Sequence, residues 1–331
     1  MRKCLLLLGL AMIGSHCFWP QFGQAQEAFV AKPFPGDLHP NNFYILENSA
    51  YQVWIERHHG VISRIRDKMG ELDLIVEPRL VDNWRFCLPI PPTLTDPGTQ
   101  ANYFLGKDQT LSAVEQTSNS VTLRWTGPLK NTDGTTFPLS AAMVVNLAGY
   151  DIEFRFDLTN SSRLKIMEVW YPLLGGLQGL ANRRATLVHI PWREGEKNSD
   201  IFWNTRLPYE LGNPFPEYLY PVEPGKMPES WMDVYNKVLG RGFYFGLHAG
   251  DGGGRRILRI EMQPGVGVSR QGDSWPRPEE LTPNIPVGLT LGWVYFFDPK
   301  ETWAGEEFHG ALTVLRAHSG DWRAAADFYP R

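Results

Sequence analysis

The residues best suited to chemistry are aromatic and gather in one stretch of the chain. Recognition of a sugar needs flat apolar side chains against the C–H face of the ring, with a few fixed hydrogen-bonding groups beside them. Between residues 192 and 275 the sequence supplies both kinds of side chain. The predicted carbohydrate-binding residues are Trp192, Trp203, Tyr218, Tyr220, Trp231, Asp233, Asn236 and Trp275. Any one of these aromatics alone is more typical of core or loop packing, so the prediction concerns the cluster.

A histidine and a carboxylate lie three residues apart at the end of an expected strand. His248 and Asp251 are the candidate catalytic residues, because such a pair can perform acid–base catalysis or help to hold a metal. The glycines at 252–254 explain the same stretch equally well as a turn. Thirty-six acidic residues ensure that some carboxylates lie close together, and none is singled out as a glycosidase pair. No motif in the sequence fixes a reaction.

Composition excludes several classes of function. The chain of 331 residues carries 32 Lys and Arg against 36 Asp and Glu, without a block of like charge, so neither nucleic acid nor an anionic membrane is an expected partner. The three cysteines, Cys4, Cys17 and Cys87, form no metal-binding or redox pair. The glycine-rich run lacks the features of a P-loop or an EF-hand. The sequence therefore predicts no metal and no cofactor.

The elements that must position these residues are predominantly β-strands. From Asp151 to Thr159 apolar and mostly charged residues alternate, which is typical of an antiparallel strand with one wet face. About a dozen further segments follow this period, and aromatic residues make up 13% of the chain, beside 32 Gly and 26 Pro. With almost no helix between them, these strands predict an all-β fold: a large antiparallel sandwich.

Two segments break the strand pattern. The six prolines between Leu207 and Pro228 are incompatible with a central strand, so this stretch is expected to be a long ordered loop. Near the C-terminus, Asp321 suits a helix N-cap and an apolar stripe follows at helical spacing from Trp322 to Tyr329. So short a helix is marginal unless it docks. It either packs on the sandwich or introduces a further domain.

The N-terminus has the layout of a secretory signal. Arg2 and Lys3 precede about ten apolar residues, and Gly23 and Ala25 are the small residues expected before a cleavage site. The sequence therefore predicts a signal peptide over 1–25 and a secreted or periplasmic protein. An N-terminal extension over 26–40, the β-sandwich domain over 41–318 and a helix beginning within 319–331 complete the expected organisation.

Several segments carry a resemblance to a known fold family. The stretch from Tyr51 to Ile75, with its His59 to Lys68 core, resembles the strand-turn-strand that opens galactose-mutarotase-like β-supersandwich domains, and Asp151 to Pro172 is similar to a later part of them. The segment Ser230 to Asn236, followed by Gly242 to His248, looks like a bacterial group in which such a domain precedes a glycoside-hydrolase-like (β/α)8 barrel. Gly320 to Tyr329 resembles the segment that leads into the barrel.

This resemblance implies an exported β-supersandwich module that binds an oligo- or polysaccharide or supports a (β/α)8 barrel domain, here without the barrel and its catalytic carboxylates. One alternative is a sugar epimerase or polysaccharide lyase that uses the concave sheet face, with His248 as base and Asp251 or Asp233 as its partner. Another is a structural domain whose exposed aromatics meet a protein. The His and Glu constellation of true aldose epimerases has no clear match in the sequence.

Overall fold

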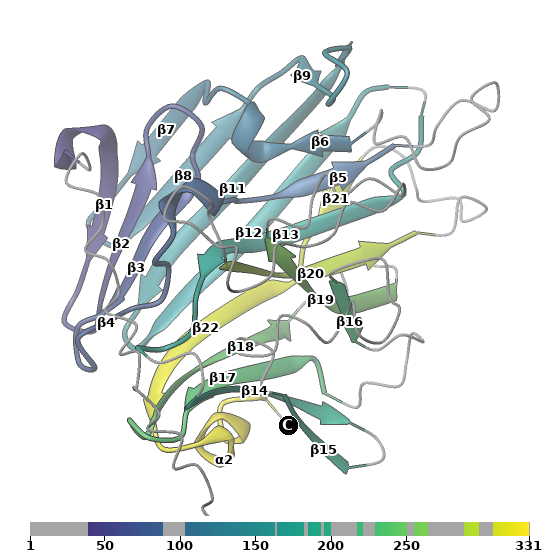
Figure 1. The fold of residues 1–331 in the computed structure, drawn as a ribbon. Helices are drawn as coiled ribbons and strands as arrows, with labels where there is room; N and C mark the ends of the chain where they lie inside the picture. The colour runs from purple at the N-terminus through teal and green to yellow at the C-terminus, as the bar shows by residue number, and fades with distance from the viewer. Residues whose placement is uncertain are drawn as a thin grey trace, which may run out of the picture.

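The structure, a computed structural model, describes most of the chain after the predicted N-terminal extension. The described residues are 39–88, 103–162, 164–181, 185–192, 195–199, 217–220, 229–249, 255–263, 288–297 and 307–330. They fold as antiparallel β-sheets with three 3-10 turns and one short α-helix (Figure 1). Among the described residues, no helix has the length and apolar character needed to cross a membrane.

The largest sheet has the strand order β15-β14-β17-β18-β22-β12-β11-β8-β7, with β21 also paired to β12. Its strands are β7 (Ala113–Gln116), β8 (Ser120–Trp125), β11 (Leu139–Ala148), β12 (Asp151–Asn160), β14 (Thr186–Trp192), β15 (Gly195–Ser199), β17 (Trp231–Asn236), β18 (Arg241–Ala249), β21 (Glu307–His309) and β22 (Leu312–Ser319). Neighbouring strands are antiparallel throughout. The predicted strand at 151–159 is thus confirmed as β12, near the middle of this sheet.

A second sheet of six strands has the order β16-β19-β20-β13-β5-β6. Its strands are β5 (Arg85–Cys87), β6 (Tyr103–Leu105), β13 (Glu168–Leu177), β16 (Glu217–Tyr220), β19 (Arg255–Gln263) and β20 (Gly288–Phe296). Strand β16 lies inside the proline-rich segment that was expected to be a loop. It occupies the edge of the sheet, the position at which neighbouring prolines are tolerated.

Two smaller sheets and three turns complete the described fold. A four-stranded sheet contains β1 (Phe43–Glu47), β2 (Tyr51–Glu56), β3 (Ile62–Asp67) and β4 (Leu72–Asp73), and a two-stranded sheet contains β9 (Leu129–Lys130) and β10 (Thr136–Phe137). The 3-10 turns are η1 (Pro40–Asn42), η2 (Pro78–Leu80) and η3 (Gly106–Asp108).

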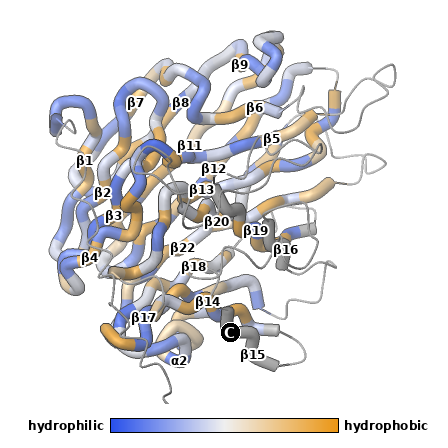
Figure 2. Tube along the Cα trace, in the orientation of Figure 1, coloured by the Kyte–Doolittle hydropathy of each residue, from blue (hydrophilic) through white to orange (hydrophobic). Residues whose placement is uncertain are grey.

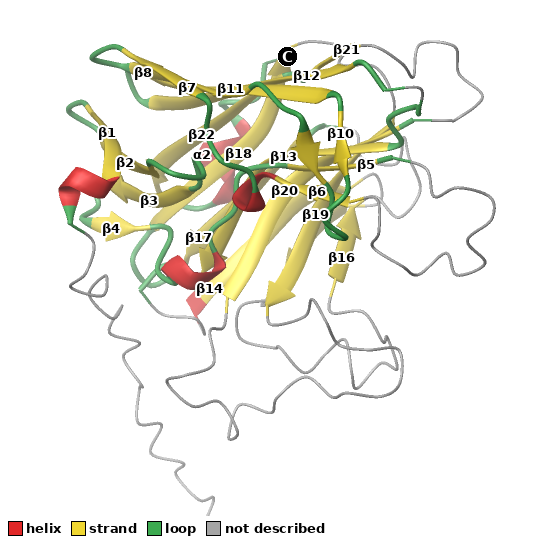
Figure 3. Ribbon diagram, turned by 90° about the horizontal axis from the view of Figure 1, so that it is seen from above, coloured by secondary structure: helices red, strands yellow, loops and turns green. Residues whose placement is uncertain are grey.

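The core lies between the two large sheets. Seen from above, β8, β11 and β12 form one layer over β13, β20 and β5 (Figure 3). The core side chains come from the strand positions that point inward, which are every second residue. Along β12, Ile152, Phe154 and Phe156 are fully buried, while Arg155 between them is exposed. Figure 2 shows the same alternation as changes of colour along the strands. Both layers contribute to one apolar cluster, so the two sheets form a sandwich.

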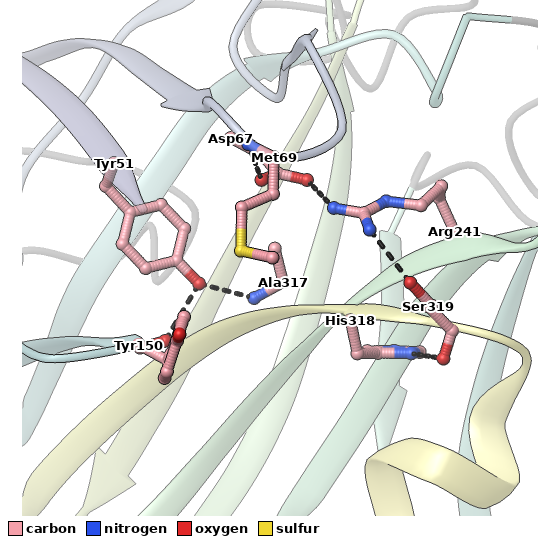
Figure 4. Close-up of polar contacts among 8 residues, drawn as sticks. All are labelled: Tyr51, Asp67, Met69, Tyr150, Arg241, Ala317, His318 and Ser319. Atoms are coloured by element: carbon pink, nitrogen blue, oxygen red, sulfur yellow. Dashed lines mark hydrogen bonds and ion pairs between the residues drawn. The ribbon is translucent and has the colours of Figure 1, made fainter. Parts of the chain in front are cut away.

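Two polar links tie the four-stranded sheet to the ten-stranded sheet (Figure 4). The hydroxyl of Tyr51 accepts a hydrogen bond from the Ala317 N–H at 2.7 Å and donates to the Tyr150 carbonyl at 2.9 Å. Beside it, Arg241 pairs with the carboxylate of Asp67 and donates to Ser319 Oγ. Four separate parts of the chain, at residues 51–67, 150, 241 and 317–319, therefore meet here.

The C-terminal helix α2 (Trp322–Ala326) packs against the sandwich. Asp321 caps it by accepting a hydrogen bond from the Arg323 N–H at 3.0 Å, as the sequence predicted. The helix contacts β17, β18 and β22, and Ala325 is fully buried in a cluster with Trp231 and Tyr244. The expectation that this helix packs on the sandwich is confirmed, and the expectation that it introduces a further domain stays a prediction.

Candidate functional site

Three of the predicted carbohydrate-binding residues lie on β17 and are buried. Trp231 is 2% exposed beneath α2, and its indole N–H donates to Glu229. Asn236 is fully buried, and its Oδ1 accepts hydrogen bonds from Val238 and Leu239 in the turn after β17. As the protein is folded here, these side chains stabilise the strand and its turn and offer no open face to a ligand.

Asp233, the third of these residues, forms a buried pair with His318. Its Oδ1 lies 2.9 Å from His318 Nε2, whereas its Oδ2 has no hydrogen-bond partner although the residue is 0% exposed. Burial raises the pKa of the Asp233 carboxyl, and the hydrogen bond with His318 opposes that effect. The ring of Trp322 from α2 stacks on the neighbouring His189 at 4.1 Å between centroids. This polar pair therefore lies under the C-terminal helix.

The other predicted binding residues are described only in part. Trp192 ends β14, and Tyr218 and Tyr220 lie in β16, where the structure describes the backbone. Trp203, Trp275 and the candidate catalytic residue Asp251 lie outside the described residues. A carbohydrate contact at any of these positions stays a prediction.

His248, the candidate base, lies half-buried near the end of β18. Its Nε2 is 3.0 Å from the hydroxyl of Tyr244, and burial lowers the pKa of the imidazole. Burial also raises the pKa of the Tyr244 hydroxyl well above its usual value, so this phenol stays protonated. Asp233, one proposed partner, is bonded to His318 instead. In the described part of the chain, no carboxylate is hydrogen-bonded to His248.

A different group of side chains converges on the outer face of the six-stranded sheet. Trp170 in β13 pairs with Arg85 of β5 on one side and with Val294 of β20 on the other, and Arg259 lies on β19 just beyond β20. The guanidinium carbons of Arg259 and Arg85 lie 3.7 Å and 4.4 Å from a ring centroid of Trp170. The indole is thus held between two cations that approach from strands on opposite sides.

The next row of the same face carries a carboxylate, a thiol and a phenol. Glu168 of β13 pairs with Cys87 of β5, which pairs with Tyr103 of β6. Glu168 Oε2 accepts a hydrogen bond from Trp170 Nε1 at 3.0 Å and one of 3.5 Å from the Tyr103 hydroxyl. We call the residues Arg85, Cys87, Tyr103, Glu168, Trp170 and Arg259 the arginine–tryptophan patch.

Exposure and electrostatics distinguish this patch from the core. Trp170 is 1% exposed and Arg85 9%, whereas Tyr103, Glu168 and Arg259 are half-buried. Burial first, and then the charge of Glu168, raise the pKa of the Tyr103 hydroxyl well above its usual value. The same two causes raise the pKa of the Cys87 thiol to about 12. Both groups are therefore neutral hydrogen-bonding groups at physiological pH.

The patch can bind a ligand by hydrogen bonds, but it does not resemble a metal site. Guanidiniums, a phenol and a carboxylate next to an indole are groups that suit a ligand rich in hydroxyls. Among the described residues, no cluster of histidine, cysteine and acidic side chains could hold a metal ion. The expectation that the chain binds no metal stays a prediction.

The sequence contained only a partial signal for this patch. Glu168 and Trp170 share a strand face by alternation, but their partners come from β5, more than eighty residues earlier, and from β19, almost ninety residues later. Long-range pairing of this kind cannot be deduced from spacing. Aromatic residues are denser at 192–275, so the density of aromatics gave no signal at Trp170.

Comparison with known proteins bears on the fold. No model of a protein family matches the sequence, and the comparison with curated proteins gives no match. Among solved structures, the chain is similar to an α-N-acetylgalactosaminidase from Bifidobacterium bifidum, at a TM-score of 0.50 and 9% identity over 86% of this chain and 37% of that one. A galactose mutarotase related enzyme from Lactobacillus acidophilus gives 0.49 and 13% over 84% of this chain and 97% of the other. The fold is galactose-mutarotase-like.

A galactose mutarotase-like protein from Lactobacillus casei is also similar, with a TM-score of 0.44 and 11% identity over 83% of this chain and all of the other. The strands and sheets of the described residues confirm the predicted all-β fold, and the short C-terminal helix is confirmed as well. At these identities the likeness concerns the fold alone, and the chemistry of the site has to be argued from its own side chains.

Proposed function

We propose that this protein is an exported carbohydrate-binding module and that the arginine–tryptophan patch is its binding surface. The observation that carries the proposal is the convergence of Arg85, Arg259, Glu168 and Tyr103 around one indole on an outer sheet face. The half-buried Arg259, Glu168 and Tyr103 offer a charged donor, a charged acceptor and a phenol within one small area, which matches the many hydroxyls of a sugar. Trp170 and Arg85 are buried and position them. The carbohydrate-related fold of the structural neighbours supports the same ligand class.

Affinity electrophoresis of the full chain in gels containing neutral polysaccharides tests this proposal. Arg259→Gln removes a half-buried cation, and we expect it to weaken retention by roughly tenfold or more, because hydrogen bonds to charged groups contribute the most. Tyr103→Phe should weaken it less. The matched control is Arg124→Gln, which removes an exposed cation on β8 of the other sheet and should leave retention unchanged. Equal retention of all four proteins would refute the assignment of the site.

A second candidate is support of a glycoside-hydrolase-like (β/α)8 barrel domain. Its support is the alignment with the larger N-acetylgalactosaminidase, of which this chain matches 37%. Coexpression with a barrel encoded next to the chain, followed by gel filtration, tests whether the two form a complex. Separate elution of the two proteins would count against this role.

Activity as an epimerase or lyase is the remaining alternative. Its support is the contact of His248 Nε2 with the Tyr244 hydroxyl at 3.0 Å, which pairs a candidate base with a candidate acid. Polarimetry of anomer interconversion, together with ultraviolet detection of unsaturated products, tests both reactions. A rate that survives His248→Ala would remove this histidine as the base.

A further inference from the structure

We propose that Glu168 restricts the ligand of the arginine–tryptophan patch to uncharged carbohydrate that donates a hydroxyl to it, and that uronic or sulfated sugars are rejected. The inference rests on the proposed carbohydrate-binding function and names the class of ligand. It assigns Glu168 the role of a specificity-determining residue.

Among the described residues, one carboxylate oxygen of Glu168 accepts hydrogen bonds and the other accepts none. Its Oε2 accepts from Trp170 Nε1 at 3.0 Å and, at 3.5 Å, from Tyr103, and both donors are neutral. In the part of the chain that the structure describes, no hydrogen bond or ion pair reaches Oε1. Because the Glu168 residue is half-buried, this oxygen can accept a hydrogen bond from a ligand.

The surrounding patch carries charges of both signs. Arg85 and Arg259 bring two cations, and Glu168 and Asp82 bring two carboxylates, with Asp82 Oδ2 at 3.7 Å from Arg85. The guanidinium carbons of both arginines lie over the rings of Trp170. With charges of both signs around Trp170, the charge of the carboxylate next to the ligand decides which ligand group can approach Oε1.

A ligand group next to Oε1 experiences opposite effects according to its charge. A sugar hydroxyl donates a charge-assisted hydrogen bond to the carboxylate. A uronate or sulfate at the same place is repelled, and it also loses its own hydration. Two like charges about 4 Å apart repel each other more strongly near a protein surface than in water. A repulsion energy between these two limits weakens binding by roughly tenfold or more.

The experiment uses one polysaccharide in two forms. A neutral polysaccharide retained by the full chain is oxidised at its primary hydroxyls to uronate, and retention of both forms is measured. We expect the oxidised form to be retained roughly tenfold less, and Glu168→Gln, which keeps the shape but removes the charge, to bring the two forms within about threefold of each other. Glu153→Gln, on the other sheet and bonded to Asn146, is the matched control and should leave the ratio unchanged.

Several results would overturn the inference while leaving the proposed function in place. These are equal retention of the two forms by the native protein, a glycan panel in which only acidic polysaccharides are retained, and an equal loss of both forms in Glu168→Gln. The last would show that Glu168 only holds Trp170 and Tyr103 in place. Failure of every glycan to be retained would instead refute the proposed function itself.

Discussion

Replacing Tyr51 by Phe tests how the four-stranded sheet is attached to the ten-stranded sheet. The side chain is 1% exposed, and its hydroxyl bridges the Ala317 N–H at 2.7 Å and the Tyr150 carbonyl at 2.9 Å (Figure 4). Removing one oxygen therefore breaks two hydrogen bonds that join β2 to the β11–β12 turn and to β22. The ring itself stays, so no large cavity is created.

The expected cost follows from these contacts. Each hydrogen bond contributes about 1 kcal/mol, and the Ala317 N–H, left without a partner beside a buried ring, adds about 1 to 2 kcal/mol. The Tyr150 carbonyl belongs to a residue that is 60% exposed, so water can replace its lost donor. We expect Tyr51→Phe to lower the free energy of unfolding by about 2 to 3 kcal/mol.

Urea unfolding followed by tryptophan fluorescence measures this difference as a shift in midpoint at constant slope. Tyr150→Phe is the matched control: its hydroxyl lies on an exposed side chain, and the expected change is below about 0.5 kcal/mol. Hydrogen exchange at the Ala317 amide measures the protection of this one hydrogen bond, and we expect faster exchange in Tyr51→Phe. An unchanged midpoint together with unchanged exchange would show that the bridge does not stabilise the sandwich.

Three further predictions concern the C-terminal helix, the buried acid and the thiol. Deleting 321–331 removes the stack of Trp322 on His189, so calorimetry should show that Tm falls by about 5 to 10 °C. An unchanged Tm would mean that the helix adds no stability. Because burial raises the pKa of Asp233, its contribution to stability is complete below the unfolded carboxyl pKa of about 4 and is lost as pH rises through the raised pKa; Asp233→Asn should flatten that loss in urea titrations, and an identical pH profile would contradict this. Cys87, whose pKa burial raises to about 12, should react with a thiolate-specific reagent at pH 8 far more slowly than in the urea-unfolded chain, and equal rates would disprove its burial.

Alternation predicted the strands well because a sandwich strand has one buried face. Along β12 and β8 the apolar residues fall at every second position, and both segments are strands as expected. The pattern was less informative where both faces are covered. All six residues of β17 are buried, since its inner face meets the core and its outer face meets α2 or neighbouring side chains.

This double burial explains why the candidate site was predicted only in part. Trp231 and Asp233 have the residue types of a sugar site, and their coverage by α2 depends on packing between segments almost a hundred residues apart. The amphipathic stripe predicted the helix, but not the face on which it docks. The arginine–tryptophan patch likewise depends on strand pairing, which fixes the neighbours of Trp170 and has no counterpart in local spacing.

The position of β22 has a consequence for how the chain acquires its structure. This strand, over Leu312–Ser319, lies between β18 and β12 in the middle of the ten-stranded sheet. Until it has been synthesised, β7, β8, β11 and β12 cannot join the block of β14, β15, β17 and β18, and each block presents an unpaired edge. Folding of the ten-stranded sheet must therefore be completed after β22 has been translated, and it depends on contacts of long sequence separation, which makes it slow. A long interval before β22 inserts between β18 and β12 keeps the chain unfolded for longer. Until then the unpaired edges of β12 and β18 are the places where aggregation would begin.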